Sequence, residues 1–206
     1  MAKPPKISAA PAVVRTRRAY FDFKHGQLHV RTAFPTTGGF DEQVTLFCLH
    51  GAQGSSRSFA RLLPLIADVR SVYAPDLPGC GESDPSPNAT LGEAAGAVAD
   101  LAADLRLRQI DLLGIQTGAA VALELAAAKP ELVRRLVLVG TPTAERLPSV
   151  KQPALVMRTR LEPAEVLPKI KEAVPNGKFV EALEFAHDLF EAAPAESIKQ
   201  LAAFLR

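Results

Sequence analysis

The sequence predicts an α/β protein with a mostly parallel sheet of about eight strands and helices on both faces of the sheet. Two observations lead to this class. Short runs of apolar residues alternate along the chain with longer stretches, rich in alanine and leucine, that have helical spacing. Several of the short runs end in turns that contain glycine, proline or histidine. This alternation is typical of repeated strand–helix units, in which successive strands lie parallel.

A basic leader precedes the predicted domain. Residues 1–18 contain proline and carry five cations before the first acidic residue of the chain, namely Lys3, Lys6, Arg15, Arg17 and Arg18. We expect this leader to be partly disordered, with a binding arm as the alternative. Residues 19–206 then form a single domain, because a chain of 206 residues is large enough for one good core and short for two.

The elements follow one another in a regular order. A hairpin is predicted at 20–24 and 27–34, because apolar and polar residues alternate on both sides of a His-Gly pair. Further strands are predicted at 44–49, 71–74, 110–113, 136–139, 154–157 and 178–183. Helices are predicted at 57–66, 91–105, 119–129, 163–174 and 194–205. Thr90 is placed to cap one helix, Pro130 ends another, and Pro194 lies near the start of the last.

The most informative segment is Gly114-Ile115-Gln116-Thr117-Gly118, between a predicted strand and a predicted helix. A sharp strand–turn–helix junction forces its central residue into a strained backbone conformation, and small flanking residues let strand and helix pass closely. Gly114 and Gly118 supply these flanks. The central residue, Gln116, has a neutral amide whose nitrogen lone pair is delocalised into the carbonyl. A neighbouring histidine therefore cannot turn it into a useful nucleophile.

Three further motifs accompany this turn. A turn that starts with His50 and Gly51 follows the strand at 44–49, and a glycine-rich loop from Asp76 to Ser83 follows the strand at 71–74. His187 stands between the last predicted strand and the last helix. The order and spacing of the four motifs resemble the α/β-hydrolase superfamily, particularly the small esterases, epoxide hydrolases, haloperoxidase-like enzymes and carbon–carbon bond hydrolases. The resemblance covers roughly residues 19–206 and implies an α/β-hydrolase fold.

The resemblance also implies roles for individual residues. Gln116 occupies the nucleophile position, and His187 matches the catalytic base. The backbone N–H groups of Ala52 and Thr117 match the oxyanion hole, where two donors can lower a barrier by several kcal/mol. The motifs are completed by residues whose role is structural: His50, Gly51, Gly114 and Gly118.

The acid that orients His187 is predicted with an alternative. The family has a glycine and then an aspartate after the strand that matches 154–157, whereas this chain has Glu162 and no glycine there. Either carboxylate can accept the Nδ1–H bond of a histidine, so Glu162 is the expected acid. Arg158 or Arg160 could instead capture it as an ion pair, and Glu145 is the second candidate.

The segment that carries a helical lid in many relatives is short in this chain. Twelve residues, 141–152, separate the strands at 136–139 and 154–157, and they include Pro142 and Pro148. We therefore expect no lid domain and an open, partly apolar groove at the site. Exposed apolar grooves are commonly covered by a partner or by a second subunit. We therefore consider a homodimer that covers the open active-site face as a hypothesis.

Two hypotheses for function differ in class. In the first, the protein is a hydrolase of the ester or carbonyl type with impaired nucleophilic chemistry, and His187 acts as a general base on water towards a small apolar ester or carbonyl compound. In the second, it is a pseudoenzyme, a non-catalytic binding or interaction protein derived from a hydrolase. A nucleophile supplied by Ser55, Ser56 or Thr117 is a third alternative, but the two serines are better placed to cap the helix at 57–66.

Composition and short motifs limit the kinds of partner and cofactor that are expected for this chain. A net charge of +2 is too small to indicate a nucleic-acid partner. The four histidines include no pair at ligand spacing on a helix, and no phosphate-binding glycine loop occurs, so neither a metal nor a cofactor is expected. No apolar run predicts a signal peptide or a membrane span. Cys48, in an apolar run, and Cys80, in a loop, make no disulfide framework, which favours a reducing cytoplasm.

Overall fold

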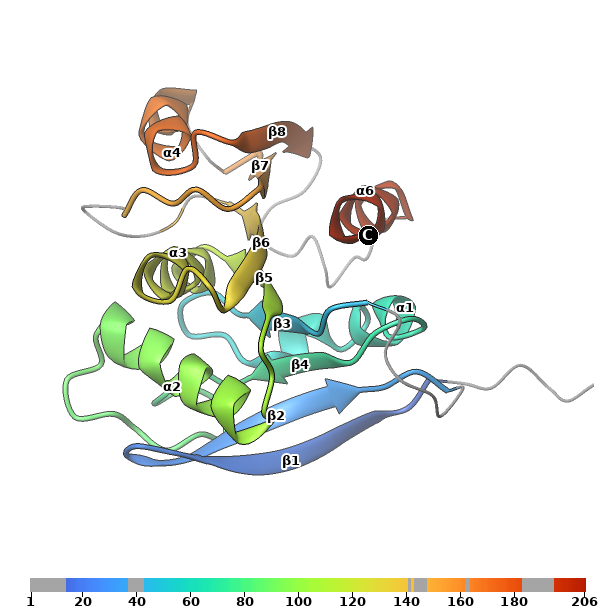
Figure 1. Cartoon of the computed structure of the whole chain (residues 1–206), viewed down its shortest axis with the longest axis vertical. Helices are drawn as coiled ribbons and strands as arrows, with labels where there is room; N and C mark the ends of the chain where they lie inside the picture. Colours follow the sequence, from blue (N-terminus) through green and yellow to red (C-terminus); the bar gives the residue numbers. More distant parts are fainter. Residues whose placement is uncertain (1–13, 37–42, 141, 143–147, 162–163, 183–194) are drawn as a thin grey trace, which may run out of the picture.

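Eight strands of the described chain form one sheet at the centre of the molecule (Figure 1). The computed structural model describes residues 14–36, 43–140, 142, 148–161, 164–182 and 195–206. The strands lie across the sheet in the order β1-β2-β4-β3-β5-β6-β7-β8. Their bounds are Thr16–Phe23 for β1, Gly26–Ala33 for β2, Leu46–Leu49 for β3, Val72–Pro75 for β4, Ile110–Ile115 for β5, Val133–Val139 for β6, Ala154–Thr159 for β7 and Gly177–Ala182 for β8.

The sheet is parallel except at one edge. β1 pairs with β2 and β2 with β4 in antiparallel orientation, whereas every further pair from β4 to β8 is parallel. The residues of β3, β4 and β5 are all buried. Burial on both faces is what makes parallel strands continuous apolar runs in the sequence. The predicted fold class, a mostly parallel sheet of about eight strands flanked by helices, is confirmed.

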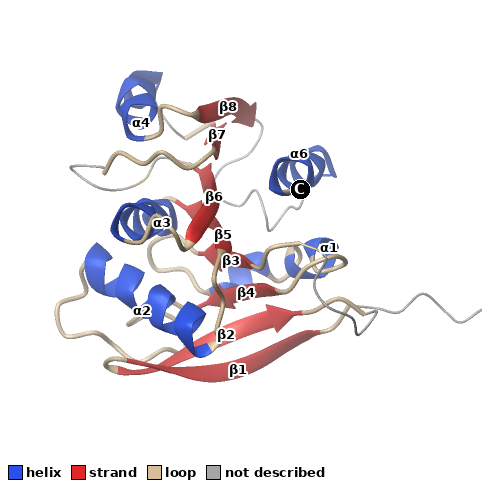
Figure 2. Ribbon diagram, in the orientation of Figure 1, coloured by secondary structure: helices blue, strands red, loops and turns tan. Residues whose placement is uncertain are grey.

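Helices cover both faces of the sheet (Figure 2). α2 (Leu91–Asp104), α3 (Thr117–Ala128) and α4 (Leu167–Ala173) lie on one face, and α1 (Leu63–Ile66) and α6 (Ala195–Leu205) lie on the other. Each helical layer has its own cluster of buried apolar side chains. Val98 of α2 and Val121 of α3 belong to one cluster, and Leu63 of α1 and Leu201 of α6 to the other.

Proline divides two of the predicted helices. The predicted helix at 57–66 is a 3-10 turn, η1 (Ser56–Phe59), followed by α1, which has Pro64 in its first turn. The predicted helix at 163–174 consists of a second 3-10 turn, η2 (Ala164–Val166), and α4, which has Pro168 in its first turn. A proline fits the first turn of a helix but removes a hydrogen bond and clashes in the interior, so the chain starts a new helix at each proline. Continuous helices were the wrong prediction here.

The first strand begins earlier than predicted. β1 starts at Thr16, within the predicted leader and before the expected strand at 20–24, and it pairs with β2 along its whole length. Most of its side chains are exposed because β1 is an edge strand. An exposed edge strand needs no apolar alternation, so the sequence carried no pattern to mark its start. Residues 1–13 of the predicted leader lie outside the described residues.

A buried ion network joins the C-terminal helix to the amino ends of the central strands. Asp111 of β5 is fully buried and accepts hydrogen bonds from Arg70 at 3.0 Å and from Arg134 at 2.6 Å. Both guanidinium groups also donate to the carbonyl oxygen of Leu205, at 2.8 and 3.0 Å. The last carbonyl groups of a helix have no partner within the helix and carry partial negative charge, so two cations at this end stabilise the position of α6.

Candidate active site at the strand–helix elbow

Gln116 lies at the tip of a sharp turn between β5 and α3. Its backbone angles are φ 49° and ψ −106°, a conformation that residues other than glycine rarely adopt. Strain of this kind is typical of the nucleophile elbow, in which a turn from strand to helix exposes one side chain at the carboxyl edge of the sheet. The backbone of an elbow is therefore present around a residue that has no nucleophilic atom.

The two glycines of the elbow are required by close backbone contacts. A Cβ atom on Gly114 would lie 2.4 Å from the carbonyl oxygen of Gly118, and one on Gly118 would lie 2.1 Å from the carbonyl oxygen of Leu49. Real Cβ atoms do not come closer than 3.0 Å to such atoms. The first turn of α3 thus passes directly over the end of β3. This contact brings the turn that follows β3 next to Gln116.

The side-chain amide of Gln116 lies against that turn. A Cβ atom on Gly51 would lie 2.7 Å from Oε1 and 3.7 Å from Cβ of Gln116. Ala52, the next residue, is exposed, and Thr117 is the first residue of α3. The first N–H groups of a helix have no acceptor within it and form the positive end of its dipole. The residues assigned to the nucleophile position and to the oxyanion hole therefore come from two segments that touch.

His50 holds the turn after β3 in place. Its side chain is fully buried, with Nδ1 2.8 Å from the carbonyl oxygen of Gly51 and Nε2 2.9 Å from the backbone nitrogen of Leu77. Because a backbone N–H can only donate, Nε2 accepts and Nδ1 carries the hydrogen. Burial lowers the pKa of His50, although the bond to Gly51 and the charge of Asp76 act in the opposite direction. A neutral ring that is bonded through both nitrogens positions the backbone and does not act as a base.

A second buried cluster, centred on Asp76, fixes the glycine-rich loop after β4. Asp76 accepts hydrogen bonds from the N–H groups of Ser56, at 2.5 Å, and Glu82, at 2.9 Å, and its Oδ2 lies 2.9 Å from Nδ1 of His29. Gly81 has φ 56°, and a Cβ atom there would lie 2.1 Å from Oδ2 of Asp76. Burial raises the pKa of Asp76, but the hydrogen bonds from Ser56 and Glu82 outweigh it, so that the pKa lies below its ordinary value. The carboxylate thus connects three segments through His29 of β2, Ser56 of η1 and Glu82 of the loop after β4.

Sequence reasoning placed His29 in the N-terminal hairpin and gave it no role. In the structure its side chain is buried beside Asp76. The available signal was a histidine between Leu28 and Val30, in a predicted strand, in a chain whose glycine-rich loop begins with Asp76. Cys80 of the same loop is partly buried, and burial raises the pKa of its thiol, which disfavours a thiolate nucleophile.

A cavity among the described residues lies beside the Asp76 cluster and not at the elbow. It has a volume of about 890 Å³ and is lined mainly by polar residues, among them Ser55, Arg57 and Glu82. Neither Gln116 nor Gly51 is among its lining residues. Since the elbow presents its side chain at the carboxyl edge of the sheet, the elbow defines the candidate active site more directly than the size of a cavity does.

Three of the predicted site residues lie outside the described residues, namely His187, Glu162 and the alternative acid Glu145. Within the described residues, no group of three or more His, Cys, Asp or Glu side chains is arranged to hold a metal ion. Among the described helices, none combines the length and the apolar character that crossing a bilayer requires.

The family model of the α/β hydrolase fold matches residues 44–170. This range contains β3 to β7, the turn after β3, the Asp76 loop and the elbow. Together with the sheet order and the backbone of Gln116, the match defines the class of the protein: the chain belongs to the α/β hydrolase fold family.

Individual relatives carry names of hydrolytic enzymes. The uncharacterized hydrolase YugF of Bacillus subtilis is 35% identical over 96 residues, which are 46% of this chain and 35% of that protein. Pyrrolizixenacetamide deacetylase of Xenorhabdus hominickii is 36% identical over 97 residues, 46% of this chain and 36% of that protein. The chain thus spans about a third of the length of the curated relatives that it matches.

A solved structure extends the likeness of fold over nearly the whole chain. The crystal structure of a predicted CIB-like hydrolase from Thermoplasma acidophilum superposes with a TM-score of 0.81 at 17% identity. The superposition covers 93% of this chain and 98% of the other chain. At this identity the likeness is one of fold.

Proposed function

We propose that this chain is a protein of the ester- or carbonyl-hydrolase type in which conventional nucleophilic catalysis is impaired. The observation that carries the proposal is Gln116 at the tip of a strained elbow, with its amide against Gly51. The substrate is a small apolar ester or carbonyl compound. The relatives named as a hydrolase and as a deacetylase support this chemical class.

The proposed chemistry uses water in place of a side-chain nucleophile. His187, oriented by Glu162, takes a proton from water while the water oxygen adds to the carbonyl carbon. The N–H groups of Ala52 and Thr117 stabilise the oxyanion that forms. Loss of a triad nucleophile leaves an acceleration of roughly 10³- to 10⁴-fold over water, so we expect a slow enzyme.

The size of Gln116 supports the impairment of catalysis and gives one reason why the proposed reaction on water is slow. Its amide reaches Gly51, next to the residue whose N–H is assigned to the oxyanion hole. A carbonyl oxygen that approaches the N–H of Ala52 would therefore meet the glutamine side chain. A smaller residue at position 116 would open this space, whether or not it is a nucleophile.

The test is hydrolysis of p-nitrophenyl acetate and butyrate by the purified chain and three variants. His187→Ala removes the base, Gln116→Ser introduces a nucleophile, and Gln116→Ala is its matched control, which opens the same space without one. We expect slow turnover in the parent that falls by about two orders of magnitude in His187→Ala. Gln116→Ser should gain activity and become labelled by a fluorophosphonate, whereas the parent and Gln116→Ala should not be labelled. Covalent labelling of the parent, or turnover that survives His187→Ala, would refute the proposed chemistry.

The second candidate function is a non-catalytic binding protein. The connection from Val139 of β6 to Ala154 of β7 is short, which supports a chain without a cap and with an open active-site face. We propose that a second copy of the chain covers this face. Absence of measurable ester hydrolysis by the parent and by all three variants would favour the binding role. A monomer in light scattering at micromolar concentration would count against the covered face.

A further inference from the structure

A cavity of about 460 Å³ lies between α6 and strands β6 to β8. It belongs to the amino-terminal part of these strands, because Arg135 of β6 lines it and pairs in register with Asp111 near the start of β5. Gln116 follows the opposite end of β5. The cavity is therefore separate from the candidate active site.

Two polar atoms in the wall of this cavity are buried and have no hydrogen-bond partner, namely Nη1 of Arg135 and Oε1 of Gln200. The guanidinium carbon of Arg135 lies 5.9 Å from the ring centroid of Phe204, so the cation is held over an aromatic face. Buried polar groups in folded proteins are nearly always paired, because an unpaired one loses its hydration without compensation. The wall of the cavity thus holds a cationic donor without an acceptor, Nη1 of Arg135, and a neutral acceptor without a donor, Oε1 of Gln200.

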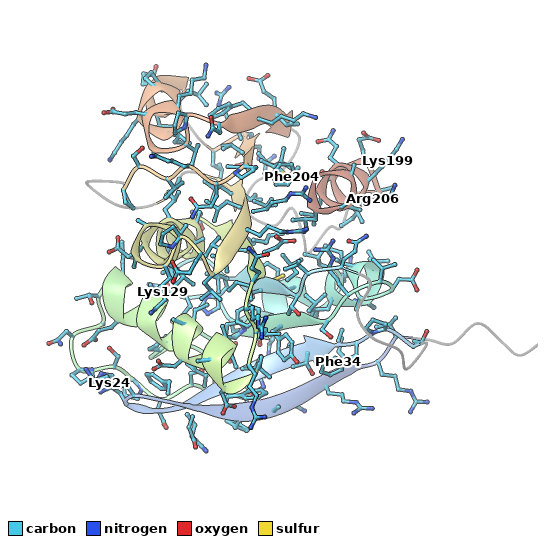
Figure 3. The ribbon with its side chains drawn as sticks, viewed as in Figure 1. Lys24, Phe34, Lys129, Lys199, Phe204 and Arg206 are labelled. Carbon is cyan, nitrogen blue, oxygen red and sulfur yellow. The ribbon has the colours of Figure 1, made fainter. Side chains whose placement is uncertain are left out.

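The charge of the lining favours an anion. Arg135, Lys178 and Lys199 are cationic, and Glu196 is the one acidic residue among the described lining residues, which leaves an excess of two positive charges. Lys178 and Lys199 are exposed and can attract an anion from solvent. Figure 3 labels Lys199 and Phe204 on α6, with Phe204 on the side of the helix towards the sheet.

The rest of the wall is apolar. Leu155 and Val180 contribute from neighbouring strands, and Phe204 contributes its ring. The volume lies within the range of cavities that bind small organic ligands. A bare inorganic anion would leave this apolar surface in contact with water, whereas an anion with an apolar body would cover it.

We propose that this cavity binds a small organic carboxylate with an apolar body about the size of one ring. The carboxylate accepts hydrogen bonds from Arg135, whose planar guanidinium matches two carboxylate oxygens. The apolar body packs against Phe204 and Leu155. The site is independent of the hydrolase chemistry proposed above, since none of its residues belongs to the elbow or to the oxyanion turn.

Isothermal titration calorimetry with benzoate tests the site, with benzamide as the neutral control of the same shape. Benzoate should bind the parent protein, and benzamide should bind at least tenfold more weakly because it lacks the charge. Arg135→Gln should weaken benzoate binding about tenfold. Lys199→Gln should weaken it about two- to threefold, an effect that salt removes. Lys129→Gln, an exposed lysine of the opposite helical layer (Figure 3), should bind as the parent does.

Benzoate could instead occupy the elbow as an analogue of a hydrolysis product, so Gln116→Ser is included. Unchanged benzoate affinity in Gln116→Ser supports the proposed site, and an affinity that rises or falls severalfold in this variant overturns it. Absence of benzoate binding to the parent, equal binding of benzamide, or unchanged affinity in a folded Arg135→Gln variant would each overturn the proposal. If Arg135→Gln does not fold, Phe204→Leu replaces it, and unchanged affinity in that variant has the same meaning.

Discussion

Replacement of Gly118 by alanine should destabilise the protein, although alanine is the better helix former. By itself, the exchange of glycine for alanine favours a helix by about 0.5–1 kcal/mol. The new Cβ of Gly118→Ala would lie 2.1 Å from the carbonyl oxygen of Leu49 and 2.6 Å from that of His50. These are backbone atoms of the segment under α3 and cannot rotate away. Overpacking costs about 1–3 kcal/mol and occasionally more, so we expect a net loss of about 2 kcal/mol.

Gly96 provides a matched control for this prediction. It lies in α2, and an added Cβ there would meet nothing within 4 Å, so Gly96→Ala should gain about 0.5–1 kcal/mol. Urea unfolding followed by circular dichroism measures both free energies. Thermal midpoints should fall by about 4–8 °C for Gly118→Ala and rise by a few degrees for Gly96→Ala. A Gly118→Ala protein as stable as the parent, beside a stabilised Gly96→Ala protein, would refute the close passage of α3 over β3.

Two further predictions concern buried side chains that can carry a charge. Asp111→Asn should reduce the free energy of unfolding by about 3–5 kcal/mol, because it leaves the buried guanidinium of Arg70 without its counter-charge. The matched change Glu181→Gln, at the exposed pair with Arg158, should cost less than about 1 kcal/mol, and equal effects in urea unfolding would contradict the reasoning. Burial lowers the pKa of His50, so the unfolded chain takes up the proton first as pH falls below about 6.5. The contribution of His50 to the free energy of unfolding should be complete above this pH and should be lost as pH falls towards the pKa of the folded state. The free energy of unfolding of His50→Gln should therefore fall less than that of the parent between pH 7.5 and 5.5. An identical pH dependence of the two proteins would argue against a buried neutral ring.

The elbow illustrates which structural features a local sequence pattern can indicate. In the structure Gly114 and Gly118 flank a residue with a strained backbone, a feature that a sequence pattern can indicate because strand, turn and helix are contiguous and their requirements are local. The approach of Gln116 to Gly51 was expected only through the family resemblance. The distance between the two segments depends on β3 and β5 being neighbours in the sheet, and no local pattern reports which strands are neighbours.

The buried polar clusters were not predicted from the sequence. His29 and Asp76 are 47 residues apart, and Arg70 and Leu205 are 135 residues apart. Asp76 and Arg70 taken alone are compatible with an ordinary surface position, where such side chains are most often found. Burial and pairing followed only from the crossing of distant strands and from the docking of α6.

By itself, the sequence determined the class of fold, the order of strands and helices and the presence of Gln116 at the centre of a strand–turn–helix junction, because apolar periodicity and turn chemistry are properties of neighbouring residues. It could not locate the start of the edge strand β1, which buries little, or the helix starts imposed by Pro64 and Pro168. Only the tertiary structure decided where the Asp76 and Asp111 carboxylates find their partners and where Arg135 faces a cavity. Those arrangements arise from contacts between segments far apart in the chain, whose energies depend on geometry that is formed only when the sheet is complete.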